Sequence, residues 1–147
     1  MKQQDLIILY VTTIVLDIVL LYILYSNVLV LFDRLFIWAM LIVHVLFYYA
    51  LFSEWRILLN ILHYVLFVSL CIGIFLQDGY LLCLCLGLVF LIQILWIFED
   101  RCILNETPGE FGYDEWLSSG TLLWTMIYAW KLGYTYALFP SSESETY

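Results

Sequence analysis

The chain has 147 residues, of which 65 % are hydrophobic and 19 % aromatic, while only 12 % carry charge. A soluble domain of this length could not bury so much apolar surface, so these values exclude an ordinary water-soluble fold. The net charge of -8 argues against nucleic acid as a partner, because binding nucleic acid needs a basic surface. The partner that fits such a chain is a lipid bilayer, and we expect one membrane domain over residues 1–147.

The apolar runs along the chain are continuous and do not alternate in polarity, which indicates helices and argues against barrel strands. A helix needs about 20 apolar residues to cross the hydrocarbon layer. Four runs of about this length are strong candidates, and a fifth run is a weaker candidate that carries Lys131. In chain order, the predicted spans are residues 6–32, 35–53, 57–76, 80–98 and 121–139. The sequence therefore predicts an all-α integral membrane bundle.

The connections between the first four spans are short and polar. They are Asp33-Arg34, residues 53–56 and residues 77–79. Connections this short make sequential helices antiparallel neighbours. The first run is longer than one crossing requires, so we expect it to tilt or to place residues 25–27 in the headgroup layer.

The orientation in the membrane follows from the basic residues of the short loops. Lys2, Arg56 and Arg101 fall on the side of the N-terminus, and Arg34 falls on the opposite side. We therefore expect a cytoplasmic N-terminus. Five spans then place the acidic, serine-containing tail at residues 140–147 on the far side of the membrane, whereas an interfacial or re-entrant fifth segment would leave it cytoplasmic.

Most of the net charge lies in a predicted loop over residues 99–120, where six acidic residues stand against Arg101. We interpret this loop as a solvated cap of the bundle. The alternative is a cation-binding or partner-docking loop, but its acidic residues lack the fixed spacing of a calcium loop.

An aspartate, Asp17, interrupts the first apolar run near its middle. Counted from the N-terminal side at about 1.5 Å per residue, Asp17, His44 and Lys131 lie ~14 to 16 Å deep. A charge that faces lipid at this depth costs at least ~2.5 kcal/mol, so these side chains should face the bundle interior. We predict that Asp17 is the counter-ion of Lys131 or of a protonated His44. His63 and Gln93 form a second polar level ~8 to 9 Å deep.

Polar residues also gather on one helical face in three of the predicted spans, and we expect these faces to point inward. The first face carries Tyr10, Thr13 and Asp17; the third span carries Arg56, Asn60 and His63; and the fifth carries Thr121, Thr125, Tyr128, Lys131 and Thr135.

Two interpretations of this polar layer compete. In the structural one, hydrogen bonds and ion pairs between helices fix which helix meets which. In the functional one, Asp17, His44, His63 and Lys131 form a proton or cation relay. A haem between His44 and His63 is a third reading, but their depths differ by about one helical turn and the sequence carries no haem-attachment motif, so we expect no cofactor.

The sequence contains no constellation typical of an enzyme or a metal site. The motifs G-x-S-x-G and H-E-x-x-H are absent, as is a glycine-rich phosphate loop, so we expect no enzymatic activity. The cysteines form no C-x-x-C pair, which argues against a metal site. Gly79, Cys83 and Gly87, spaced by four, predict a small-residue groove for a helix of another protein or of a second copy.

One local stretch, LWIFEDRCILNE at residues 95–106, resembles a segment near span ends in small polytopic membrane proteins of large eukaryotic DNA viruses. The resemblance implies a viral or protist origin and brings no activity or site assignment. It departs from that pattern at Leu95, where a histidine is expected. The residues that carry it are Trp96, Glu99, Asp100, Cys102, Leu104 and Asn105.

Taken together, these patterns predict a small multi-pass membrane protein without enzymatic activity, serving as a structural or accessory component of a membrane or membrane complex. The alternative is a proton or cation channel or carrier that uses the intramembrane polar layer.

Overall fold

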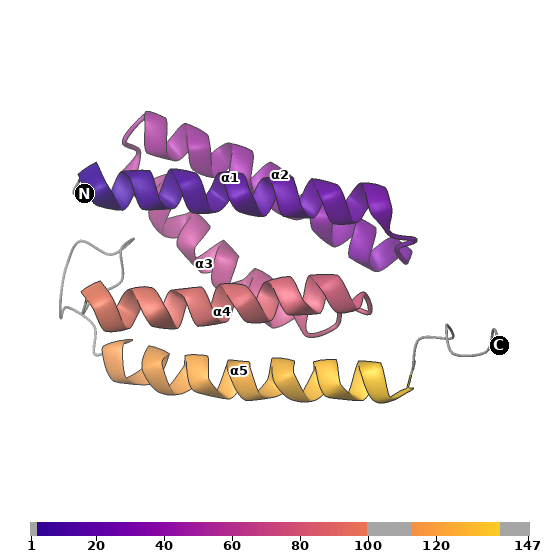
Figure 1. The fold of residues 1–147 in the computed structure, drawn as a ribbon. Helices are drawn as coiled ribbons and strands as arrows, with labels where there is room; N and C mark the ends of the chain where they lie inside the picture. The colour runs from indigo at the N-terminus through magenta and orange to yellow at the C-terminus, as the bar shows by residue number, and fades with distance from the viewer. Residues whose placement is uncertain (1–2, 100–112, 139–147) are drawn as a thin grey trace.

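The computed structural model describes the backbone of residues 3–99 and 113–138 and the side-chain surroundings of residues 6–94 and 122–135. The described backbone consists of helices joined by short turns, with no β-strand in it, which confirms the all-α fold class. The helices are α1 (Gln3–Ser26), α2 (Leu31–Phe52), α3 (Arg56–Gly73), α4 (Gly79–Glu99) and α5 (Tyr113–Leu138) (Figure 1).

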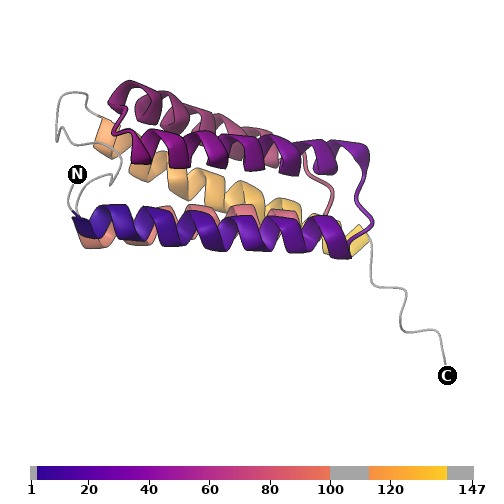
Figure 2. The same ribbon diagram turned by 90° about the horizontal axis from the view of Figure 1, so that it is seen from above.

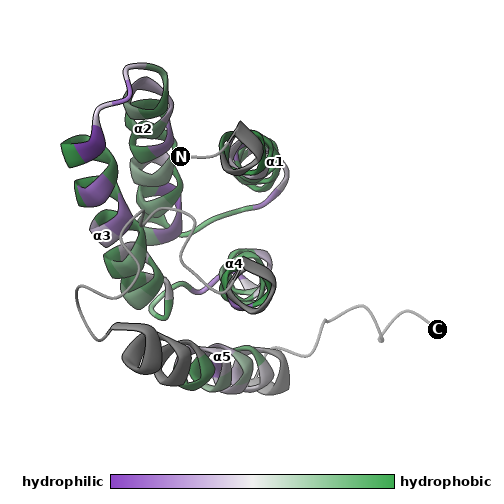
Figure 3. Cartoon of the chain, turned by 90° about the vertical axis from the view of Figure 1, so that its left-hand side faces the viewer, coloured by the Kyte–Doolittle hydropathy of each residue, from purple (hydrophilic) through white to green (hydrophobic). Residues whose placement is uncertain are grey.

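Helices that follow one another along the chain pack against one another. The most extensive contacts join α4 to α5, α1 to α2 and α2 to α3, while α3 and α1 contact α4 over smaller areas. Figures 1 and 2 show α4 beneath α1 along the same direction, with α5 inclined to both. Seen along its length, the bundle has α2 and α3 on one side, α1 and α4 on the other, and α5 below α4 (Figure 3). The predicted antiparallel neighbours are therefore confirmed.

The core lies around α4, the helix that contacts three others. Its fully buried large side chains are Ile37, Leu76, Leu81, Leu82, Val89 and Tyr128. By contrast, large apolar side chains cover the outer surfaces of the helices, among them Ile18, Tyr22, Val45 and Trp130. A water-soluble bundle would place polar residues on those outer faces.

Three helical segments are long and apolar enough to cross a membrane, namely Leu6–Ser26, Leu31–Phe52 and Arg56–Gly73. The described part of α4 adds a shorter apolar helix, Gly79–Ile94. The first three spans predicted from the sequence thus correspond to helices of sufficient length and composition.

The boundary between the first two helices differs from the prediction. Helix α1 ends at Ser26 and α2 begins at Leu31, so the turn lies at residues 27–30 and not at Asp33-Arg34. The expectation that polar residues mark the turn was wrong here because Asp33 is buried in the first turn of α2. A carboxylate is favourable at that position, where it faces the positive end of the helix dipole.

Asp33 joins the two turns at this end of the bundle. Its carboxylate accepts hydrogen bonds from the backbone N–H of Gln77, at 3.2 Å, and of Asp78, at 2.7 Å. Asp78 in turn accepts the backbone N–H of Leu81 at 2.9 Å, which caps α4, and the side-chain N–H of Asn27 at 3.1 Å. These contacts hold the turn between α1 and α2 against the turn between α3 and α4.

Replacing Asp33 by asparagine is expected to destabilise the bundle by about 1 kcal/mol, because the amide keeps one acceptor oxygen and loses the other. Reversible unfolding in bicelles measures the change. Gln77→Asn is a suitable control, since Gln77 bonds to Asp33 through its backbone. An Asp33→Asn protein as stable as the parent would contradict this role for the carboxylate.

The turn between α2 and α3 falls where the sequence places it, although Arg56 already belongs to α3. The N–H of Trp55 donates to the carbonyl of Ala50 at 3.0 Å, and the N–H of Glu54 donates to the carbonyl of Leu51 at 3.4 Å. This is the Schellman pattern, which needs a left-handed residue after the helix. Glu54 fills that position with a φ of 51°.

Replacing Glu54 by glycine is expected to stabilise the bundle by about 0.5 to 1 kcal/mol, because glycine adopts a positive φ without the steric penalty of a Cβ. The same unfolding measurement detects the gain. Glu54→Ala keeps the Cβ and should bring no comparable gain, so equal stabilisation by both variants would rule out backbone strain as the cause.

Helix α5 begins earlier than the predicted fifth span. It starts at Tyr113, so residues 113–120 are helical, and their assignment to the acidic loop was wrong. Residues 100–112 of the predicted loop and the predicted tail at residues 140–147 lie outside the described residues.

Candidate functional site

A polar contact joins α1 to α2 near the middle of both helices. Asp17 Oδ1 lies 2.6 Å from His44 Nδ1, and Asp17 Oδ2 accepts a hydrogen bond from the hydroxyl of Tyr48 at 2.9 Å. His44 and Tyr48 are four residues apart, so both side chains leave the same face of α2. One carboxylate of α1 therefore binds two side chains of α2.

The residues next to this contact shield it. The ring of Tyr10 stacks on that of Tyr48, with ring centroids 6.0 Å apart and ring planes inclined by 10°. Thr13 is buried, and its hydroxyl donates to the carbonyl of Leu9 at 2.7 Å. The exposed fraction is 22 % for the Asp17 side chain and 10 % for that of His44. The polar face predicted for the first helix thus points at α2.

This geometry supports a charge-assisted hydrogen bond. In the tautomer with its hydrogen on Nδ1, His44 donates to one carboxylate oxygen, and the phenol of Tyr48 donates to the other oxygen. The carboxylate of Asp17 thus contacts both polar side chains of this face of α2. Such a contact can hold two helices together, or it can serve as a proton-binding site on a transport pathway.

The structure brings Asp17 to His44, one of its two predicted partners. It does not bring Asp17 to Lys131, and in the described part of the chain no ion pair joins these two residues. Helix α4 lies between α1 and α5, as Figures 1 and 3 show. The prediction of an Asp17–Lys131 pair was wrong because depth along a helix fixes a level in the bundle but not which helices are neighbours.

His63 does not join this cluster. Its Nδ1 is buried without a hydrogen-bond partner, and its ring contacts Tyr64 edge-on, with centroids 6.2 Å apart. No hydrogen bond or ring contact connects His63 to Asp17 or His44 among the described residues. The continuous relay and the pair of haem ligands considered from the sequence would both need His63 close to His44.

The polar face of the third helix differs from the expectation. Arg56 and Asn60 are exposed on the outside of α3, and only His63 is half-buried. The prediction that this face points inward was therefore wrong for its first two members. Figure 3 shows hydrophilic residues in the first turns of α3, at the outer edge of the bundle.

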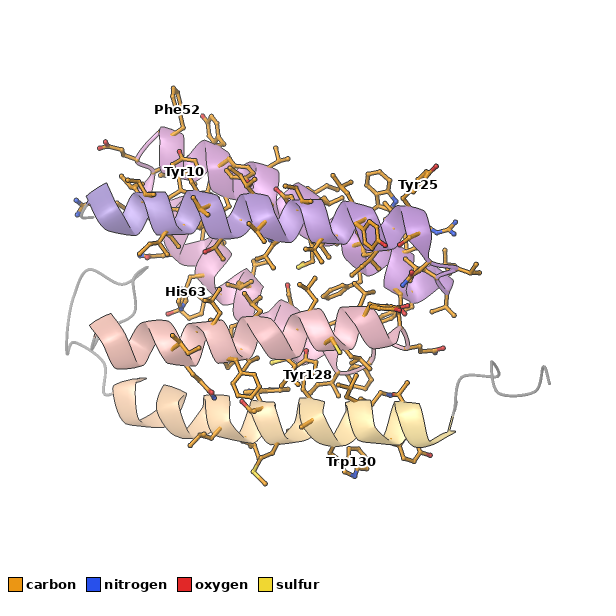
Figure 4. The ribbon with its side chains drawn as sticks, viewed as in Figure 1. Tyr10, Tyr25, Phe52, His63, Tyr128 and Trp130 are labelled. Atoms are coloured by element: carbon orange, nitrogen blue, oxygen red, sulfur yellow. The ribbon has the colours of Figure 1, made fainter. Side chains whose placement is uncertain are left out.

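A second set of polar contacts joins α4, α5 and α3. Gln93 donates from its amide to the hydroxyl of Thr125 at 3.0 Å. Tyr128 is fully buried, and its hydroxyl donates to the carbonyl of Leu70 in the last turn of α3, at 2.5 Å. Figure 4 shows Tyr128 pointing from α5 toward α4. Lys131 is half-buried, and its backbone carbonyl accepts the hydroxyl of Thr135 at 2.9 Å.

The close approach between helices occurs at a different glycine from those predicted. A Cβ built on Gly73 would collide with the hydroxyl of Tyr128 and lie 3.1 Å from Cys85 Sγ. By contrast, Cys83 and Gly87 are exposed, and nothing lies within 4 Å of a Cβ built on Gly87. The predicted groove of small residues, which begins at Gly79, is therefore unoccupied by the described part of this chain.

Sequence reasoning missed three residues that hold the structure together. Tyr48 could have been predicted as a contact of Asp17, because it lies one turn after His44 on the same face of the helix. Asp33 and Asp78 looked like ordinary turn residues, and their pairing depends on which turns meet in space. Within the described residues, no group of three or more His, Cys, Asp or Glu side chains could hold a metal ion.

Comparisons of the chain with protein families, with curated proteins and with solved structures find no match. The resemblance at residues 95–106 stays a prediction. Residues 100–106 of that stretch lie outside the described residues.

Proposed function

We propose that this protein is a multi-pass α-helical membrane protein without enzymatic activity, and that it serves as a structural or accessory component of a membrane or membrane complex. The observation that carries this proposal is the distribution of polarity. Apolar side chains cover the outer faces of the helices, while Asp17 turns inward to His44 and Tyr48. A bilayer is the solvent in which this arrangement is stable.

The dimensions of the helices support the same proposal. Helices of 21 and 22 residues, such as Leu6–Ser26 and Leu31–Phe52, are about 30 Å long, which is the thickness of the hydrocarbon layer. The 21 residues of α4 and the 26 residues of α5 reach that length as well. We therefore propose five spans, and the distribution of Lys and Arg in the short loops supports a cytoplasmic N-terminus.

The polar contacts supply the structural part of the proposal. Without a hydrophobic driving force between helices in lipid, polar side chains commonly determine which helices associate. Asp17 with His44 and Tyr48 attaches α1 to α2, and Gln93 with Thr125 attaches α4 to α5. Tyr128 adds a hydrogen bond from α5 to the carbonyl of Leu70 in α3, so polar contacts attach each of these helices to a neighbour.

Accessibility of the two chain ends in sealed membrane vesicles tests insertion and topology. Protein tagged at either end should resist extraction by alkaline carbonate, with the N-terminal tag on the cytoplasmic side and the C-terminal tag opposite. Release by carbonate would overturn the membrane proposal. Both tags on one side would leave an even number of spans. Asn105-Glu106-Thr107 is a glycosylation sequon, and sugar on Asn105 would reverse the proposed orientation.

A proton or cation conductor is the second candidate function. The observation that favours it is the direct contact of a carboxylate, an imidazole and a phenol in the middle of two apolar helices. Ionisable residues at such depths often mark transport pathways. Among the described residues, neither His63 nor Lys131 contacts Asp17, His44 or Tyr48, so the structural role has the better support.

Flux measurements in liposomes separate the two candidates. Under the structural proposal, liposomes that contain the protein carry proton and cation flux no faster than empty ones, across pH 5 to 8. A pH-dependent flux that disappears in Asp17→Asn would establish the conductor instead. Asp33→Asn is the matched control, because Asp33 lies at the end of the bundle and bonds to backbone amides.

A further inference from the structure

The polar contact between α1 and α2 lies where the interior of these two helices changes in character. Toward the end of the bundle that carries Asp33, the buried side chains of α1 and α2 are apolar. Leu20 follows Asp17 by one turn of α1, and Ile37 precedes His44 by two turns of α2. A layer of apolar side chains offers no hydrogen bonds to a proton or an ion. It therefore separates the contact from that end of the bundle.

Toward the other end, where α1 and α3 begin, the groups next to the contact are polar. The hydroxyl of Tyr48 donates to Asp17, and the ring of Tyr10 stacks on that of Tyr48. Thr13 adds a buried hydroxyl one turn before Asp17. Figure 4 shows Tyr10 and His63 toward this same end of the bundle.

His63 provides a second observation on this half of the bundle. It lies about 10 Å from the start of α3, and its buried Nδ1 has no hydrogen-bond partner within the described residues. A buried nitrogen of this kind is costly unless water reaches it. The interior at this end is therefore suited to water, whereas the interior beyond Leu20 and Ile37 is suited to apolar contacts.

The chemistry of the contact identifies a proton as its ligand. Histidine is the side chain whose charge ordinarily changes between pH 5 and pH 8, and the carboxylate beside it accepts a proton as well. A metal cation such as Ca²⁺ would need six or more oxygen ligands, and one carboxylate with one phenol does not supply them. The described residues 79–94 of α4 contain no Asp, Glu, His, Lys or Arg. The other titratable groups near the pair are the phenols of Tyr10 and Tyr48 and, in α3 without contact to the pair, the imidazole of His63.

We propose that Asp17 and His44 form a proton-binding site that exchanges protons only with the side of the membrane on which the N-terminus lies. The inference rests on the proposed insertion of α1 and α2 into the bilayer. The proton enters past the hydroxyls and leaves by the same route, because the apolar layer at Leu20 and Ile37 closes the other one. Such a site binds protons without carrying them across the membrane. It lets the acidity of one compartment act on the attachment between α1 and α2.

Labelling with dicyclohexylcarbodiimide in sealed liposomes tests the site. This apolar reagent enters the bilayer and adds to a carboxylic acid in its protonated form, so the rate of labelling reports protonation, and peptide masses identify the labelled residue. Liposomes with the N-terminus outward are selected by an N-terminal tag, and the pH is varied on one side at a time between 5 and 8. We expect the rate at Asp17 to fall about tenfold for each unit by which the outer pH exceeds the midpoint of the titration. The inner pH should not change it.

Two controls accompany this measurement. Asp33 lies at the opposite end of the bundle, so any label on it should not follow the outer pH. His44→Leu removes the imidazole, and because hydrocarbon favours the neutral acid, labelling of Asp17 should become independent of pH.

Several results would overturn the proposal. They are labelling of Asp17 that follows the inner pH, labelling that follows both sides or neither, and absence of labelling at pH 5 on both sides. Unchanged pH dependence in His44→Leu would exclude the imidazole from the site. Co-flotation of protein with the liposomes reports insertion separately, so failure of the proton site is distinguishable from failure of the membrane proposal.

Discussion

Replacing Asp17 by alanine is expected to destabilise the bundle by about 2 to 3 kcal/mol. The substitution removes two hydrogen bonds and leaves the imidazole of His44 and the phenol of Tyr48 without their shared acceptor. Each lost bond costs about 1 to 1.5 kcal/mol, because the donor that remains is left without an acceptor away from water. Reversible unfolding in bicelles, followed by helix separation, measures the change.

Two further variants define what Asp17 contributes. Asp17→Asn keeps one carbonyl acceptor and should lose less than half as much stability as Asp17→Ala. Ile18→Ala truncates the neighbouring residue, which is exposed on the outer face of α1, and should change stability by less than about 0.5 kcal/mol. If Asp17→Ala behaves like Ile18→Ala, the contact between α1 and α2 contributes nothing measurable.

Replacing Gly73 by alanine is expected to cost about 2 to 3 kcal/mol, because the new methyl group would occupy the position of the Tyr128 hydroxyl. That hydroxyl is held in place by its hydrogen bond to the carbonyl of Leu70 and cannot move away without breaking it. The cost arises where α3, α4 and α5 meet, so the unfolding transition should shift as a whole. Reversible unfolding in bicelles measures this loss of stability.

Removing the hydroxyl tests this explanation directly. Tyr128→Phe alone should cost about 1 kcal/mol for the lost hydrogen bond. In the Tyr128→Phe background, the nearest remaining atom of that ring is Cζ at 3.5 Å, an ordinary contact, so Gly73→Ala should cost much less there. Equal costs of Gly73→Ala in the two backgrounds would show that the hydroxyl is not the obstacle. Gly87→Ala, in open space, is the control and should be neutral or slightly stabilising.

The sequence predicted the helices well and their ends less well. Long apolar runs define the fold class because no other structure satisfies so many backbone groups beside apolar side chains. The first turn was misplaced because Asp33 looks like a loop residue when only polarity is considered. Its burial depends on the backbone amides of Gln77 and Asp78, which are distant in the sequence and which only the tertiary structure brings close.

Only part of the candidate site could be predicted from the sequence, for a similar reason. Counting residues from one side places Asp17 and His44 at the same level, and the structure has them in contact. The same count places Lys131 at that level, yet α4 separates its helix from α1. Which helices are neighbours depends on packing around α4, where Tyr128 inserts beside Gly73, and no local pattern in the sequence specifies that arrangement.

The outward position of Asn60 shows that the sequence does not specify in which direction a helical face points. Arg56, Asn60 and His63 share a stripe, and a polar stripe in an apolar helix normally faces the interior. In the structure the first two are exposed and His63 is half-buried, so the stripe runs along the edge of the interior. Periodicity identifies the stripe, and only the tertiary structure shows where it points.

A double-mutant cycle between Asp17 and His44, measured in bicelles, tests most directly whether this carboxylate attaches α1 to α2. The stabilities of Asp17→Ala, His44→Ala and the double variant should reveal a coupling of about 1 kcal/mol or more, while a cycle between Asp17 and the remote Tyr128 should be additive within about 0.3 kcal/mol. Additivity in both cycles would contradict the account, because the two side chains would then stabilise the bundle independently of each other.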